Sequence, residues 1–232
     1  MGIGRSAVIT RILTAVVLGG CILLCSPAAG DAVAIGCPDV EVVFARGTGE
    51  PPGVGWMGQQ FIDALRWRTW GRTVAVYPVD FPAVPEFGPS AAGVADAATH
   101  IRDMAADCAG TRLVLAGYSR GAALIGYVTE PTTATRFGAP LAPEVAGHVA
   151  AVALLGRPSA AFLDSIGAPP AEIGSSYAAK TIDLCALGDP VCSAGADGAA
   201  HGAYAANGMT AQAADFVVER LTPPESIPDQ PI

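Results

Sequence analysis

The stretch Arg112-Leu113-Val114-Leu115-Ala116-Gly117-Tyr118-Ser119-Arg120-Gly121 decides the fold. Its first half is a short apolar run, typical of a buried strand, and an apolar helix is predicted to follow it as far as about Val128. The junction matches G-x-S-x-G, in which a serine on a tight strand-to-helix turn exposes its Oγ. Because the helix N-terminus directs free N–H groups toward developing negative charge, we interpret Ser119 as a nucleophile.

Short apolar strands and helices alternate on both sides of this motif. Strands are predicted at 40–45, 73–77, 112–116, 149–155 and 180–184, and further helices at 56–70, 91–106 and 209–221. Alternation of this kind predicts an α/β fold, a central parallel sheet of five strands flanked by helices on both faces. Neither an internal repeat nor a linker divides the chain, so residues 35–222 are predicted to form one domain.

Both ends of the chain differ from this domain in composition. Residues 1–34 combine Arg5 and Arg11 with an apolar run and an Ala32-Val33-Ala34 cleavage pattern, which predicts a secretory signal peptide. The sequence around Cys21 also loosely matches a lipoprotein box, which would instead leave a lipid on that cysteine. We expect a secreted protein, either released or retained at the cell envelope, with a Pro-rich, disordered tail at 223–232.

Charge and cysteine content narrow the function further. Residues 35–232 keep 11 basic and 20 acidic side chains, a net charge of −9, which argues against nucleic acid and anionic membranes as partners. Four cysteines remain, and the short separation of Cys185 and Cys192 favours a local disulfide, which leaves Cys37 with Cys108. Their spacing does not suggest a metal site, and we expect neither a metal nor a cofactor.

A nucleophilic serine needs a general base and an orienting acid. In α/β-hydrolases the chain order is serine, acid, histidine, and of His100, His148 and His201 only the last follows the acid candidates. Those candidates are Asp164, Glu172, Asp183, Asp189 and Asp197. We favour Asp189, because the loop closed by Cys185 and Cys192 would hold its carboxylate against the imidazole. A turn-forming aspartate in Gly-Asp-Pro is the alternative reading.

The chain resembles the cutinases, and most of all the cutinase-like serine esterases of actinobacteria. The resemblance covers nearly all of residues 35–222. It rests on His201 and on three segments: 43–48 (VFARGT), 117–122 (GYSRGA) and 183–192 (DLCALGDPVC). It implies a lidless α/β-hydrolase of the cutinase type, with Ser119, Asp189 and His201 as catalytic triad. It also implies the disulfides Cys37–Cys108 and Cys185–Cys192.

The resemblance further implies an oxyanion hole made by the backbone N–H of Arg120 and by Thr48. The family usually has Gln after the nucleophile, whereas this chain has Arg120, which we expect to add positive charge near the site.

The predicted activity is hydrolysis of short- to medium-chain acyl esters, including lipids or polyesters, by a monomer that contacts lipid or polymer surfaces transiently. Residues 81–87 and 191–200 are the predicted rims of an open groove. Two alternatives remain: a polysaccharide (xylan) acetyl esterase, and a non-catalytic, lipid-binding relative.

Overall fold

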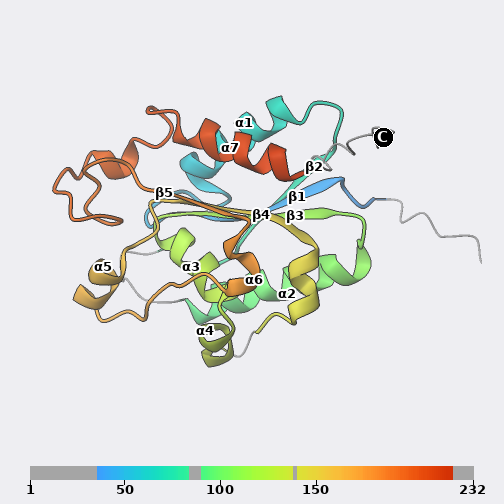
Figure 1. Cartoon of the computed structure of the whole chain (residues 1–232), viewed down its shortest axis with the longest axis horizontal. Helices are drawn as coiled ribbons and strands as arrows, with labels where there is room; N and C mark the ends of the chain where they lie inside the picture. The colour runs from blue at the N-terminus through green and yellow to red at the C-terminus, as the bar shows by residue number, and fades with distance from the viewer. Residues whose placement is uncertain (1–35, 84–89, 138–139, 222–232) are drawn as a thin grey trace, which may run out of the picture. The chain divides into compact units, whose positions relative to one another are not determined.

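A computed structural model describes residues 36–83, 90–137 and 140–221 of the chain. Its centre is a sheet of five strands, all parallel, in the order β2-β1-β3-β4-β5 (Figure 1). The strands are β1 (Val40–Ala45), β2 (Val74–Pro78), β3 (Arg112–Tyr118), β4 (Val149–Leu155) and β5 (Thr181–Leu184). The predicted fold class and the five strands are therefore confirmed.

Helices cover both faces of the sheet (Figure 1). Helices α1 (Gly55–Arg68) and α7 (Met209–Leu221) lie side by side on one face. The other face carries α2 (Ala91–Asp107) and α3 (Arg120–Thr129), with the short helices α4 (Pro131–Arg136), α5 (Ala160–Ser165) and α6 (Ser175–Ala178) beyond them. Two 3-10 turns complete the described elements, at Pro143–Gly147 and Ala200–Gly202.

Two apolar cores explain why the strands read as continuous hydrophobic runs. Alternate residues of β1 face opposite ways, so Val43 joins the core under α2 and α3, while Phe44 joins the core under α1 and α7. Every residue of β1 and β4 is buried, as expected for strands covered on both faces. The edge strands β2 and β5 are more exposed.

Strand and helix ends differ from their predicted positions by one or two residues. Strand β3 runs on to Tyr118, directly before the predicted nucleophile. Helix α1 ends at Arg68 rather than at Trp70, because Thr69 leaves helical geometry and Gly71 follows with φ of 89°. Trp70 therefore lies in a turn after the helix.

Cys37 is bonded to Cys108, which ties the start of β1 to the end of α2, and Cys185 is bonded to Cys192. The predicted signal peptide (1–34) and tail (223–232) lie outside the described residues. Among the residues that are described, no helix is both long enough and apolar enough to cross a membrane.

Candidate active site

The site lies at the C-terminal edge of the sheet, where the strand order reverses. Strand β1 pairs with β2 on one side and with β3 on the other, so the connections leaving β1 and β3 diverge to opposite faces. Ligands of open α/β sheets bind in the crevice formed at such a point. Thr48 follows β1 and Ser119 follows β3, which brings both predicted residues to this crevice.

Ser119 has the unusual backbone that the nucleophile motif predicts. Its φ is 53° and its ψ −121°, and it is the sole non-glycine residue of the described segments with a positive φ. The flanking glycines are required by close approach: a Cβ on Gly117 would lie 2.6 Å from the Gly121 backbone, and one on Gly121 only 1.9 Å from the Ala45 carbonyl oxygen. The sharp turn between β3 and α3 thus depends on both glycines.

Three predicted residues form one chain of hydrogen bonds. The Nε2 of His201 lies 2.8 Å from Ser119 Oγ, and its Nδ1 lies 2.8 Å from Asp189 Oδ2. Ser119 is 5% exposed and Asp189 is fully buried, whereas the His201 side chain retains 21% exposure. One imidazole nitrogen therefore faces the hydroxyl and the other faces a carboxylate shielded from water.

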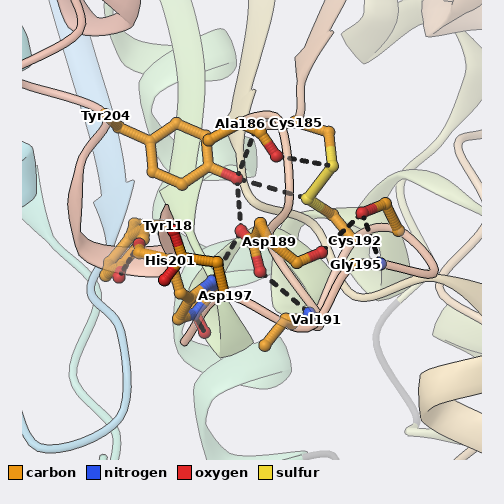
Figure 2. Close-up of polar contacts among 12 residues, drawn as sticks. Tyr118, Cys185, Ala186, Asp189, Val191, Cys192, Gly195, Asp197, His201 and Tyr204 are labelled. Carbon is orange, nitrogen blue, oxygen red and sulfur yellow. Dashed lines mark hydrogen bonds and ion pairs between the residues drawn. A yellow bond between two sulfur atoms is a disulfide. The ribbon is translucent and has the colours of Figure 1, made fainter. Parts of the chain in front are cut away.

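The carboxylate of Asp189 is held by three donors (Figure 2). Besides His201, it accepts hydrogen bonds from Tyr204 Oη (2.6 Å) and from the Val191 backbone N–H (2.8 Å). Burial by itself would raise the pKa of Asp189, but these hydrogen bonds outweigh it and hold the pKa below its ordinary value. Asp189 stays ionised beside the imidazole, which suits an orienting acid.

Two tyrosines that the sequence analysis missed support the histidine. The hydroxyl of Tyr204 accepts from the Ala186 N–H and donates to Asp189, so it connects the acid to the start of the disulfide loop (Figure 2). Tyr118 donates to the His201 carbonyl oxygen at 2.6 Å, and its ring packs against the imidazole. His201 lies in the 3-10 turn Ala200–Gly202 and Tyr204 follows that turn, so their closeness in sequence was the one available signal.

The loop after β1 carries the predicted second oxyanion donor. Glu50 accepts hydrogen bonds from the N–H groups of Gly47 (2.7 Å) and Met57 (2.9 Å), which fixes the loop against the start of α1. The Oγ1 of Thr48 is buried and has no hydrogen-bond partner. A buried hydroxyl without a partner is costly in a folded protein, and at an active site it is available to a ligand.

The side chain of Arg120, which we expected to add positive charge near the site, contacts residues 81 and 82. It is 8% exposed, and its guanidinium donates to the Pro82 carbonyl at 3.1 Å and lies over the Phe81 ring. The neighbouring carbonyls of Phe81 and Ala83 accept from the Arg46 side chain (2.8 Å) and the Gly49 N–H (2.9 Å). Residues 81–83 therefore connect the loop after β1 to the residue after Ser119.

Two of the other candidates, His100 and Asp183, have partners of their own. His100 lies 2.9 Å from Glu41 and stacks on Tyr77, and Asp183 pairs with Arg157, both away from Ser119. Phe81, predicted as a rim residue, is buried; positions 84–87 of that rim fall outside the described residues. Within the described ranges, no group of three or more His, Cys, Asp or Glu side chains is placed to hold a metal ion.

A cleft of about 370 Å³ opens next to Ser119 and His201, whose chain neighbours Tyr118 and Gly202 are part of its lining. Thr48, Trp56, Met57 and Ala205 also line it. Its size is near the lower end of the range for small-molecule sites, roughly 300–1,000 Å³.

The chain matches a known protein family over nearly all of its described residues. The family described as Cutinase matches residues 36–221, nearly the whole described part of the chain. The chain belongs to the cutinase family. Probable carboxylesterase Culp5 of Mycobacterium tuberculosis is 52% identical to this cutinase over 170 residues, 70% of this chain and 96% of that protein. Phospholipase Culp4 of the same organism is 46% identical over 210 residues, 90% of each chain.

Solved structures agree with this assignment. A Trichoderma reesei cutinase in complex with a C11Y4 phosphonate inhibitor has a TM-score of 0.62 and 29% identity, covering 81% of this chain and 78% of that one. An acetylxylan esterase has a TM-score of 0.64 at 24% identity, covering 81% and 100%, and shares the fold. As a member of this family with carboxylesterase and phospholipase relatives, the chain is a carboxylic ester hydrolase.

Proposed function

We propose that the protein is a secreted, monomeric serine esterase that cleaves short- to medium-chain acyl esters, lipid esters included, through an acyl-enzyme. The observation that carries the proposal is the hydrogen-bond chain from Ser119 through His201 to the buried Asp189, with both contacts at 2.8 Å. The modest, largely apolar cleft beside it favours acyl chains of limited length.

In the proposed reaction, His201 Nε2 takes the proton of Ser119 Oγ as the oxygen attacks the ester carbonyl. The imidazolium then gives that proton to the departing alcohol, and the acyl group stays on the serine. Water repeats the sequence: His201 takes its proton, the hydroxide attacks the acyl carbon, and the proton returns to Ser119. Asp189 remains ionised throughout and holds the imidazole in orientation.

The negative charge of each tetrahedral intermediate needs donors. We assign this role to the backbone N–H of Arg120, at the first turn of α3, and to Thr48, whose side-chain hydroxyl has no other partner. Losing one such donor costs on the order of 10²–10³ in rate.

Export is proposed on two grounds: the signal-like composition of residues 1–34, and two disulfides, which persist in oxidising compartments.

The test is hydrolysis of p-nitrophenyl esters from two to sixteen carbons, beside phosphatidylglycerol vesicles and acetylated xylan. We expect turnover of the shorter esters and a loss of several orders of magnitude in Ser119→Ala. Ser165→Ala, an exposed serine at the end of α5, should match the wild type. A preference for acetylated xylan would support the polysaccharide alternative. If the folded protein turns over no substrate and resists a serine-directed phosphonate, the esterase proposal fails and a binding role replaces it.

A further inference from the structure

All three tryptophans of the chain are exposed to solvent. Trp56 and Trp67 on α1 are 72% and 84% exposed, and Trp70 in the turn after it is 95% exposed. Tryptophan is a largely buried residue on average, because its side chain carries 150–250 Å² of mostly apolar surface. Leaving every one of them in water is unfavourable unless another surface covers them.

Two of the tryptophans share the outward side of α1, and the third follows in the turn after it. Trp56 and Trp67 are eleven residues apart, about three helical turns, so they lie on the same side of the helix. The opposite side packs into the core through Phe61, Ile62 and Leu65. Helix α1 is an outer element of the fold, beside α7 (Figure 1), and Trp56 and Trp67 on it are exposed.

Positive charge gathers at the C-terminal end of this surface, beyond the exposed Asp63, which lies one turn before Trp67 on the same side of α1. Residues 66–72 (RWRTWGR) contain three arginines and no acidic residue, in a chain whose net charge is −8. Arg68 pairs with Asp215. Arg66 and Arg72 are exposed and donate to the backbone carbonyls of Val74 and Leu221, which are neutral acceptors, although Arg72 also lies close enough to the Asp39 carboxylate to interact with it electrostatically. The net charge of the whole chain conceals this local excess of arginine. For that reason net charge alone argued against binding to anionic surfaces.

We propose that these residues, Trp56, Arg66, Trp67, Trp70 and Arg72, form a tryptophan face that docks the enzyme onto an anionic lipid surface. Indole rings are favoured at the boundary between lipid headgroups and acyl chains. Exposed arginines add attraction to lipid phosphates. The inference rests on the proposed lipid-ester activity and names where the enzyme meets its substrate phase.

Charge favours a lipid surface over a second copy of the chain as the occupant. In a two-fold dimer the same patch would meet itself, which brings the arginines of one copy toward those of the other, whereas lipid phosphates carry the opposite charge. Trp56 and Trp67 lie along one side of α1, which suits shallow insertion among headgroups, as in helices that lie in the plane of a membrane.

The face is continuous with the active site. Trp56 lines the same cleft as Thr48 and Tyr118, so a surface that receives Trp56 meets the mouth of the cleft. Docking would therefore place lipid esters beside Ser119 without a separate diffusion step through water.

Intrinsic fluorescence tests the proposal directly, since every tryptophan of the chain belongs to the face. The sample is disulfide-bonded protein carrying Ser119→Ala, so that lipid is not consumed. We expect its tryptophan emission to shift to the blue on mixed phosphatidylglycerol–phosphatidylcholine vesicles, and less so on phosphatidylcholine alone. Co-sedimentation should show a Trp67→Ala/Trp70→Ala variant losing at least roughly tenfold in partitioning. Arg66→Gln should lose about fivefold on anionic vesicles, an effect that salt weakens.

Matched controls lie on the other face of the sheet. Ile166→Ala, an exposed apolar residue after α5, and Arg136→Gln on α4 should bind vesicles like the parent protein. In the active enzyme, Trp67→Ala/Trp70→Ala should hydrolyse a soluble butyrate ester at the wild-type rate, so loss of docking and loss of catalysis are distinguishable. No fluorescence shift on either vesicle, equal binding to both, or a concentration-dependent dimer abolished by the double variant would each overturn the proposal.

Discussion

Replacing Tyr204 by phenylalanine tests how the buried acid is held. The change deletes the hydroxyl that donates to Asp189 Oδ2 at 2.6 Å and accepts from the Ala186 N–H at 3.1 Å. A hydrogen bond to a charged group contributes about 1.5–3 kcal/mol, and an orphaned buried N–H costs about 1–3 kcal/mol. We expect the free energy of unfolding at pH 7 to fall by about 2–4 kcal/mol. This is less than the sum of the two costs, because the structure around the missing hydroxyl relaxes.

The pH dependence of this loss is the sharper test. In the folded protein the pKa of Asp189 lies below its ordinary value of 3.8, so its carboxylate stabilises the fold fully above that value. This stabilisation disappears as the pH falls through the folded-state pKa. The difference in the free energy of unfolding between wild type and variant should therefore be largest near neutral pH and should shrink below about pH 4. What remains at low pH is the cost of the unpaired Ala186 N–H, which does not titrate.

Urea unfolding of both proteins from pH 3 to pH 8 measures the effect, with disulfides intact. Tyr127→Phe is a matched control, since its buried hydroxyl donates at 2.8 Å to the neutral Pro169 carbonyl. It should cost about 1 kcal/mol at every pH. A Tyr204→Phe loss below about 0.5 kcal/mol, or one that does not change between pH 7 and pH 3, would refute the account of the carboxylate.

Three further changes test other parts of the site. Gly121→Ala puts a Cβ 1.9 Å from a backbone oxygen of β1, so it should prevent stable folding or lower the free energy of unfolding by more than about 3 kcal/mol. The control Gly110→Ala meets nothing within 4 Å and should leave the melting temperature unchanged. Arg120→Gln keeps the backbone N–H but loses the bond to residues 81–83, so kcat should fall about three- to tenfold; a change in KM alone would contradict this. Replacing Cys185 and Cys192 together by alanine should cost about 2.5 kcal/mol in urea unfolding and lower kcat, because the loop that holds the triad acid is released.

The architecture was predictable because its signals are local and strong. The buried strands are continuous apolar runs, and the turn at Ser119 needs glycines at fixed positions, so both leave a pattern in the sequence. The short helices α4, α5 and α6 were not predicted. Elements of four to six residues are too short to show a helical period, and tertiary contacts decide them.

The sequence predicted which residues meet at this edge of the sheet but not the side chains that hold them. Spacing and chain order pointed to Ser119 and His201, the disulfide loop favoured Asp189, and the structure joins the three by hydrogen bonds. The role of Tyr204 depends on a buried carboxylate 15 positions earlier, and the guanidinium of Arg120 is directed by carbonyls 38 positions before it. Contacts between residues this far apart leave no periodic trace in a single sequence.

The parallel sheet also determines when the enzyme can first act. Every strand pairs with a strand distant in sequence, and the core beneath α1 is closed by α7, the last described element of the chain. Ser119 precedes His201 by 82 positions, and Tyr204 follows the final strand. A chain emerging from the ribosome therefore has no esterase site until its last fifth has arrived, and until then the apolar side of α1 is open to chaperones or to misfolding.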